Sequence, residues 1–206
     1  MKLFYAPGAC SIGIHYLLER IGRPYERQKL DIKSGENRQS WFTDVNPKAK
    51  VPTLQRDDGS VLTEFPVIAH YLAASAPETG LVPSDPERAL RAAELTDYLV
   101  ATMHMQGFSR IFRPAKFCEE PSAHEAIQHQ GREVVRAGLA VVERDLRPGG
   151  ALHGAATFAD AALFYVLFWT IDRVKLDAPP ACSERYAALT ASDAAARVFT
   201  AEGIVR

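Results

Sequence analysis

Cysteine is scarce in this sequence of 206 residues, which contains only Cys10, Cys118 and Cys182. The three are far apart and form no Cys-x-x-Cys pair. This pattern excludes a disulfide framework and a zinc site built from paired cysteines. Isolated cysteines are typical of proteins kept in a reducing compartment, so we expect a cytoplasmic protein.

An excess of either charge is also missing, because 24 Lys and Arg residues face 25 Asp and Glu residues, for a net charge of −1. Nucleic acids and anionic membrane surfaces require concentrated positive charge, so neither is expected as a partner. The longest apolar run, residues 161–169, is much shorter than the ~20 residues that span a bilayer. The apolar run at residues 3–6 is shorter than the ~7–15 residues of an export-signal core, and we expect no such signal.

Apolar residues are plentiful, at 47% of the chain against 24% charged residues. This balance predicts a folded protein with a packed core and no extensive disorder. The length suits one large domain or two small ones.

The first eleven residues, MKLFYAPGACS, contain the most suggestive pattern. Residues 3–6 predict a short strand, Pro7 and Gly8 break it, and residues 12–21 follow helical spacing. Cys10 and Ser11 therefore fall at the start of a helix, where unpaired N–H groups and the helix dipole favour a reactive thiolate. We expect the pKa of Cys10 to lie below the ordinary value. The opposing interpretation is a small, buried, inert cysteine, and this stretch alone leaves both open.

Residues 1–76 predict an α/β domain with the order strand, helix, strand, short helix, strand, strand, helix. A Pro-rich linker follows at 77–87, and residues 88–206 predict an all-helical domain. In the helix predicted over 88–112, helical spacing places apolar residues on one core-facing side. These residues are Leu90, Ala101, Met105, Phe108 and Phe112.

Four further helices are predicted from spacing and stop signals, over 127–146, 158–171, 183–189 and 193–200. Thr157 and Asp160 form a variant capping box at the start of the second of these. Thr157 is expected to accept from the N–H of residue 160, and Asp160 to bond back. The helix they open is apolar nearly all round and should lie in the core of the second domain.

Four segments in this order resemble the glutathione S-transferase family, most closely its bacterial beta class. They are MKLFYAPGACS, NPKAKVPTL, LTEFPVIAHYLA and TFADAALF. The resemblance covers the whole chain and implies a thioredoxin-like domain followed by an all-α domain. It also implies a homodimeric enzyme of detoxification. Such an enzyme uses glutathione as a substrate rather than a cofactor and joins its thiolate to hydrophobic electrophiles.

The resemblance assigns glutathione-binding residues along the second and third segments. Val51 precedes Pro52, whose peptide bond is expected to be cis, and offers its backbone to the cysteinyl part of glutathione. Lys50 flanks this position. Glu64 matches the residue that binds the γ-glutamyl amine. Phe65 stands where the family usually has Ser or Gly, so only its N–H is available for the γ-glutamyl carboxylate at a helix N-terminus.

Cys10 matches the beta-class cysteine that lies beside the glutathione sulfur and can form a mixed disulfide with it. Ser11 is an alternative hydroxyl donor to the thiolate. Tyr5 resembles the catalytic tyrosine of other classes, but its place within the first strand favours a structural role.

The family's His-Lys pair before a Gly-Phe/Tyr-Ser motif is displaced here. Aligned on Gly107, the His position is Met105, and His104 lies one residue away, roughly 100° around an α-helix. Met105 and Phe108 are candidates for an apolar electrophile pocket, although apolar residues at helical spacing more often form core. No histidine shows the spacing of a metal ligand, so no metal is expected.

Two other functions stay open at this point. One is glutaredoxin-like thiol–disulfide exchange at Cys10, resolved by a second glutathione. The other is a non-catalytic protein that uses the transferase fold to bind a partner, which the altered Phe65 and Met105 would permit.

Overall fold

A four-stranded sheet is formed by the first third of the chain. In the computed structural model, which describes residues 1–205, the strand order is β2-β1-β3-β4. Strand β1 runs parallel to β2 and antiparallel to β3, and β4 returns antiparallel to β3. The strands are β1 (Lys2–Tyr5), β2 (Glu26–Lys29), β3 (Thr53–Gln55) and β4 (Val61–Thr63).

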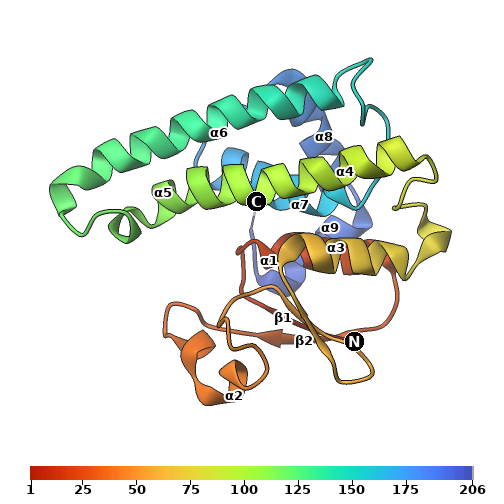
Figure 1. Cartoon of the computed structure of the whole chain (residues 1–206), viewed down its shortest axis with the longest axis horizontal. Coiled ribbons are helices and arrows are strands. Elements are labelled where there is room, and N and C mark those ends of the chain that lie inside the picture. The colour runs from red at the N-terminus through yellow and green to blue at the C-terminus, as the bar shows by residue number, and fades with distance from the viewer. Residues whose placement is uncertain (206) are drawn as a thin grey trace.

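Alternation along β1 explains how helices cover both faces of the sheet. Leu3 and Tyr5 point into the main core, beneath α1 (Ser11–Ile21) and α3 (Phe65–Ala74). Phe4 points the other way into a small cluster, where its ring lies 5.6 Å from that of Phe42. Phe42 belongs to the short helix α2 (Ser40–Thr43), which Figure 1 shows on the far side of the sheet from α1 and α3.

The order of elements predicted for the first domain is confirmed, with small shifts at the ends. The strand predicted from residue 51 begins at Thr53, because Val51 and Pro52 still belong to the preceding loop. The Val51–Pro52 peptide bond is cis, as expected. A short turn at residues 36–38 precedes α2, and another at residues 77–79 follows α3.

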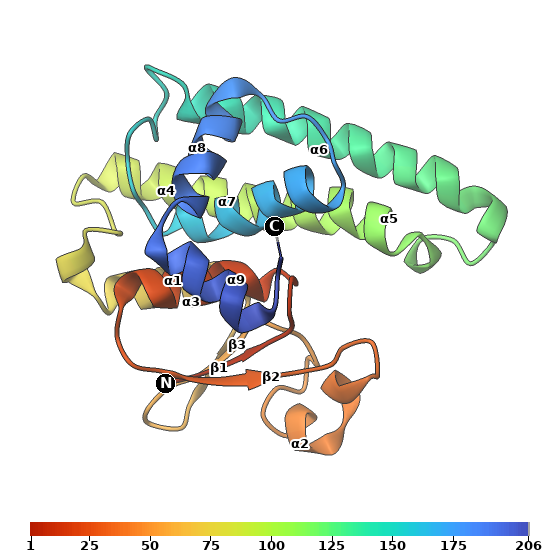
Figure 2. The same ribbon diagram turned by 180° about the vertical axis from the view of Figure 1, so that it is seen from behind.

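The rest of the chain is helical, in agreement with the predicted fold class. Two long antiparallel helical rods, one of residues 86–112 and the other of residues 124–146, lie over the α1/α3 layer. Helix α7 (Ala159–Phe168) lies between these rods and the sheet domain (Figure 1). Seen from behind, the last helix returns to pack beside α1 (Figure 2). These elements are α4 (Pro86–Tyr98), η3 (Leu99–Phe108), α5 (Ser109–Phe112), η4 (Pro114–Lys116), η5 (Pro121–Ala123), α6 (His124–Leu146), α7 (Ala159–Phe168), η6 (Trp169–Arg173), α8 (Pro180–Thr190) and α9 (Asp193–Glu202).

Helix α7 is buried along its whole length, which confirms its predicted place in the core. Its first turn carries the capping interaction in a slightly altered form. Asp160 accepts from the Thr157 N–H at 3.3 Å, as expected, whereas the Thr157 hydroxyl accepts from the N–H of Ala159 rather than from that of Asp160. The buried Asp160 carboxylate also binds Arg20 at 3.1 Å and Arg185 at 2.7 Å, so this turn connects α1 to α8.

The predicted core face of residues 88–112 is wrong for two reasons. Leu90 lies on the exposed side of the regular helix α4, and the segment that follows α4 is not an α-helix. Segment η3 is a π-helix of ten residues, and its wider turn changes which positions share a side. Leu90 and Phe112 are 59% and 46% exposed, whereas Leu95, Leu99 and Met103 are buried instead. Of the predicted face, only Phe108 is fully buried.

Three glycines set the distance between η3 and α6. A Cβ on Gly131 would lie 2.7 Å from the Gly107 carbonyl oxygen, and one on Gly107 would lie 2.8 Å from Val135. A Cβ on Gly138 would lie 2.5 Å from the side chain of Met103. Glycine at these positions is therefore required for the close approach of the two helices. At this glycine seam, formed by Gly107, Gly131 and Gly138, α6 packs against the side of η3 that faces away from the sheet domain (Figure 1).

Across residues 1–205, the structure contains no helix with the combination of length and apolar character that crossing a membrane demands.

Candidate functional site

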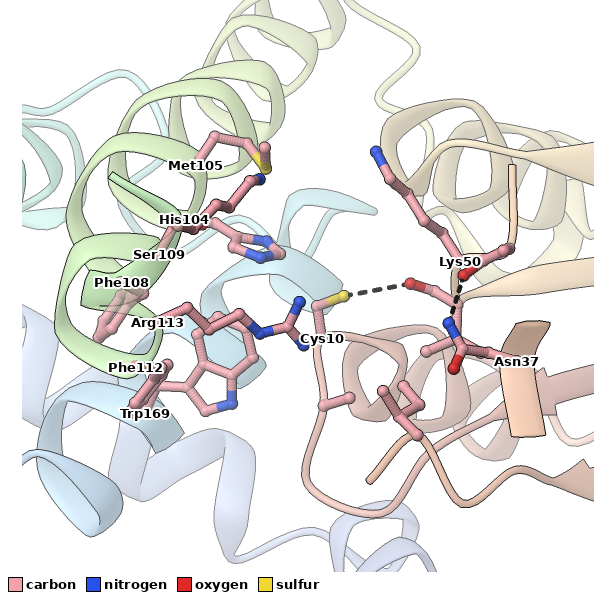
Figure 3. Close-up of a pocket in the computed structure, with 15 residues that line it drawn as sticks. Cys10, Asn37, Lys50, His104, Met105, Phe108, Ser109, Phe112, Arg113 and Trp169 are labelled. Atoms are coloured by element: carbon pink, nitrogen blue, oxygen red, sulfur yellow. Dashed lines mark hydrogen bonds between the residues drawn. The ribbon is translucent and has the colours of Figure 1, made fainter. Parts of the chain in front are cut away.

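A cavity of about 250 Å³ opens between the sheet domain and the η3–α5 rod. Figure 3 shows Cys10 at its floor, with Lys50 on one wall and His104, Arg113 and Trp169 on the other. Segments far apart in the sequence thus meet at one place. The lining residues are Ala9, Cys10, Ile32, Asn37, Ala49, Lys50, Val51, His104, Met105, Phe108, Ser109, Phe112, Arg113, Lys116 and Trp169.

Cys10 and Val51 are joined directly. The Cys10 thiol donates to the carbonyl oxygen of Val51, with 3.5 Å between sulfur and oxygen. Cys10 is the residue immediately before α1, so its sulfur lies at the positive end of that helix. The two motifs singled out in the sequence, 41 residues apart, therefore form one surface.

The expectation of a lowered Cys10 pKa is wrong. Burial raises the pKa of the Cys10 thiol from 9.0 to about 12. The Ser11 N–H and the charges of Arg113 and Lys50 act in the opposite direction, but they do not outweigh the loss of water around the sulfur. At neutral pH Cys10 is thus a protonated thiol, which can donate a hydrogen bond but is a poor nucleophile.

Two asparagines hold the loop that presents Lys50 and Val51 to the cavity. The buried Asn46 side chain donates to the Lys50 carbonyl at 2.9 Å and to the Thr53 hydroxyl at 2.8 Å. Asn37 donates to the Ala49 carbonyl at 2.8 Å from the other side. The carbonyls of Ala49 and Lys50 are satisfied in this way, the second with further help from the Thr53 hydroxyl at 2.8 Å, and the loop is fixed next to Cys10.

The opposite wall is a cluster of aromatic rings. The Trp169 indole has its ring centre 5.2 Å from that of Phe108, 5.4 Å from that of Phe112 and 4.9 Å from that of His104. Its indole N–H donates to the Gly8 carbonyl at 2.8 Å, so the wall is tied to the loop that carries Cys10. Such a wall suits a flat, apolar molecule.

His104 lines this cavity, although α-helical spacing had separated it from the family's position. The wide π turn of η3 brings both His104 and Met105 to the cavity. Burial lowers the pKa of His104 to about 4, helped by the nearby charges of Arg113, Lys116 and Lys50. The ring is therefore neutral at physiological pH. Its Nδ1 lies 3.5 Å from the Tyr165 hydroxyl.

Ser11 and Tyr5 lie outside the set of described residues that line the cavity. Ser11 is fully buried, and its hydroxyl accepts from the Ala6 N–H at 3.2 Å and donates to the Ala6 carbonyl at 3.3 Å. Its hydrogen is therefore already used inside the β1–α1 turn, and the structure gives no support to the expected catalytic role. Tyr5 is buried against His15, with ring centres 5.3 Å apart, which fits a structural role.

Glu64 and Phe65 begin helix α3 and are not among the described residues of this cavity. Glu64 is exposed, has a positive φ of 69° and pairs with Lys48 at 2.8 Å. The Phe65 side chain is buried against Tyr165, with ring centres 5.0 Å apart. Gly13 makes room for this ring, because a Cβ there would lie 2.9 Å from it. Phe65 thus packs between the sheet domain and helix α7.

The sequence analysis did not identify Asn37, Arg113, Lys116 or Trp169 as site residues. Arg113 and Lys116 belong to the run Arg-Pro-Ala-Lys, which is itself a local basic signal in the sequence. Trp169 was assigned to the core. The described residues contain no group of three or more His, Cys, Asp or Glu side chains that could hold a metal ion.

Comparisons with known proteins agree with this geometry. Residues 8–75 match the model of the glutathione S-transferase N-terminal domain. The chain is 36% identical to glutathione S-transferase GstA of Escherichia coli O157:H7 over 173 residues, 82% of each chain. The chain belongs to the glutathione S-transferase family. The predicted family and the predicted enzyme class, a transferase of glutathione, are therefore confirmed.

Solved structures of this family extend the likeness to the whole fold. A glutathione transferase homologue from Sulfitobacter, with bound glutathione, superposes with a TM-score of 0.89 at 30% identity over 99% of this chain and 98% of the other. The beta-class enzyme of Sphingomonas chungbukensis superposes with a TM-score of 0.83 at 29% identity over the full length of both. The predicted thioredoxin-like domain followed by an all-α domain is thus confirmed.

Proposed function

We propose that this glutathione S-transferase joins the glutathione thiolate to hydrophobic electrophiles in the cavity above Cys10. The observation that supports this most strongly is the contact between the Cys10 thiol and the Val51 carbonyl beneath an aromatic wall. One side of the cavity offers backbone groups to a peptide, and the other offers rings to an apolar molecule. Holding both reactants there would replace a bimolecular encounter with an oriented reaction.

In this proposal the Val51 backbone binds the cysteinyl part of glutathione and Lys50 lies at its edge. Glu64 and the Phe65 N–H, at the start of α3, bind the γ-glutamyl end. Cys10 stays protonated and, when glutathione binds, turns its S–H from the Val51 carbonyl to the glutathione thiolate, which lowers the pKa of that substrate thiol. Met105, Phe108 and His104 line the side of the electrophile.

The raised pKa of Cys10 counts against the alternative of glutaredoxin-like exchange, which needs Cys10 itself as a thiolate. The complete aromatic wall counts against a non-catalytic protein, because a partner-binding module has no need of an apolar cavity beside the thiol. Neither the Cys10 pKa nor the aromatic wall bears on how glutathione is bound. An activity test therefore has to separate the three functions.

The test combines retention on immobilised glutathione with turnover of 1-chloro-2,4-dinitrobenzene and reduction of a glutathione mixed disulfide. We expect retention and conjugation. We expect Cys10→Ala to lower kcat for conjugation at least about tenfold, the scale of a lost hydrogen bond to a charged group. Cys10→Ser, which keeps a donor, should retain most of the rate. Disulfide reduction that exceeds conjugation would favour the exchange alternative, and no turnover of either substrate would favour the binding protein.

The proposal also includes assignments that are more specific than membership of the family. They are membership of the beta class, a role in detoxification, a cytoplasmic location, a homodimer and a division into residues 1–76, 77–87 and 88–206. The exposed apolar side chains of Val67 on α3 and Leu90 on α4 support the homodimer, since a partner would cover them. Analytical ultracentrifugation of the wild type and of a Val67→Glu, Leu90→Glu double variant tests it.

A further inference from the structure

Positive charge gathers around the cavity without any matching negative charge. Three cations line it, namely Lys50, Arg113 and Lys116, and among the described lining residues there is no Asp or Glu. Within residues 1–205 none of the three forms an ion pair or a side-chain hydrogen bond. In a chain with a net charge of −1, this is a local concentration of one sign.

The charges of these side chains reach the interior of the cavity. Arg113 and Lys50 oppose the rise in the Cys10 pKa, and all three cations contribute to the lowered pKa of His104. Both are effects of a nearby positive charge. Figure 3 shows the guanidinium of Arg113 extending into the cavity between the ring of Trp169 and Cys10. A cleft whose low-dielectric walls carry charges of one sign focuses its electric field. Positive walls such as these therefore attract an anionic ligand.

The three cations divide between the two walls. Lys50 precedes Val51 on the sheet domain, on the side where the proposed function puts glutathione, itself an anion. Arg113 and Lys116 lie on the opposite wall, at the end of the helical rod, next to Phe112 and Met105. The position of these two charges beside the aromatic wall assigns them to the second substrate rather than to glutathione.

We propose that the electrophile conjugated by this enzyme is an aromatic compound that carries a carboxylate, with Arg113 and Lys116 binding that carboxylate. This inference rests on the proposed function and names the substrate class of the same cavity. The rings of Phe112 and Trp169 hold the aromatic part, and the guanidinium binds the anion in its preferred bidentate geometry. Met105, which replaces the family's histidine, leaves the apolar part of the wall uncharged.

The test compares 4-chloro-3-nitrobenzoate with 4-chloro-3-nitrobenzamide, which differ only in carboxylate against neutral amide. In both, the glutathione sulfur forms a bond to the ring carbon, chloride leaves with the electron pair of the C–Cl bond, and the thiol proton goes to solvent. For each compound kcat/KM is divided by the rate constant of the uncatalysed reaction with glutathione. We expect the wild type to prefer the benzoate at least about tenfold, as for a charge-assisted hydrogen bond.

The variants Arg113→Gln and Lys116→Gln should each reduce this benzoate-to-amide ratio severalfold, and Arg113→Lys should retain most of it. The ratio cancels any loss shared by both compounds, including a loss in glutathione binding. Arg136→Gln is the matched control, because Arg136 is exposed on α6, outside the cavity, and pairs with Glu133. Its removal changes the net charge equally and should leave the ratio unchanged.

Two outcomes overturn the inference while leaving the proposed function intact. One is equal normalised turnover of the two compounds by the wild type, and the other is a preference that survives in both Gln variants. If neither compound is turned over, turnover of 1-chloro-2,4-dinitrobenzene decides whether the proposed function holds. The inference is then decided by quenching of tryptophan fluorescence with unreactive 3-nitrobenzoate and 3-nitrobenzamide in the presence of S-methylglutathione. Equal affinities for these two compounds would overturn it.

Discussion

The carboxylate of Glu202 accepts a hydrogen bond from the backbone N–H of Gly8 at 2.8 Å, across 194 positions of the chain. Its other oxygen lies 2.8 Å from Nδ1 of the fully buried His15. Since Trp169 binds the Gly8 carbonyl, both backbone groups of this glycine are held by side chains of the helical domain. Cys10 lies two residues further on, so the last helix helps to position the thiol.

Glu202→Ala should therefore destabilise the protein and loosen the site together. The variant leaves the Gly8 N–H and the His15 ring buried without their partner, which we expect to cost about 3 kcal/mol of unfolding free energy. Denaturant titration measures this cost. Arg197→Ala, which removes an exposed ion pair to Glu19 from the same helix, is the control and should cost less than about 1 kcal/mol. Equal costs would show that Glu202 has no special role.

Cys10 should react slowly with alkylating agents at neutral pH. Burial raises its pKa to about 12, so at pH 7 its thiolate fraction is much smaller than that of an ordinary cysteine. A more basic thiolate is a better nucleophile, which recovers part of the difference. We expect alkylation by iodoacetamide at least about tenfold slower than that of a cysteine peptide. Mass spectrometry of the labelled protein follows this rate, and unfolding in urea should abolish the difference. Reaction faster than the peptide would restore the activated-thiolate interpretation.

His104 should make the fold less stable in mild acid. Its pKa is about 4 in the folded protein against an ordinary value of 6.5, so between these values the unfolded chain binds the additional proton. The stability that comes from the neutral ring is complete above pH 6.5 and is lost as the pH falls toward 4. The melting temperature of the wild type should thus decrease more between pH 7.5 and pH 5 than that of His104→Gln. A His104 resonance that titrates near 6.5 in NMR spectra would contradict this.

Glu64→Ala should weaken glutathione binding by about 1.5–3 kcal/mol, the scale of a hydrogen bond to a charged group. Isothermal titration calorimetry with glutathione measures the change. Lys48→Ala is a suitable control, because it removes the ion pair of Glu64 but leaves the carboxylate in place. An affinity that is unchanged in Glu64→Ala would reduce this residue to a surface charge at the start of α3.

The sequence was sufficient for the order of elements in the first domain and for bringing Cys10, Lys50 and Val51 to one cavity. Prolines, glycines and short apolar runs are local signals, and they predicted the order of strands and helices along the chain, while the family resemblance predicted the cis bond before Pro52. The helical domain was harder, because the spacing rule assumed 3.6 residues per turn where η3 is a π-helix. That difference changed the expected side of Phe112 and of His104. Leu90 was misplaced for another reason, because it lies in the regular helix α4, on the side away from the buried Ala92, Leu95 and Thr96.

Electrostatic properties were predicted less well than positions. A cysteine at a helix N-terminus suggested a lowered pKa, but the extent of burial decides the sign, and burial depends on residues as distant as Val51. Ser11 shows the same limit, since its hydroxyl is used by Ala6 within the turn. Arg113 and Lys116 are close in the sequence, but only the fold places them opposite Lys50 at one cavity.

The glycine seam between η3 and α6 gives this enzyme a route to new substrates that needs no substitution of any cavity residue. His104, Met105 and Phe108 all stand on η3, and the depth at which that segment sits is set from behind by Gly131 and Gly138. An added methyl group at Gly131 would lie 2.7 Å from the Gly107 carbonyl oxygen, so η3 has to shift relative to α6 to accommodate it. Selection for altered substrate range can therefore act on the outer helix, through positions that never touch a substrate.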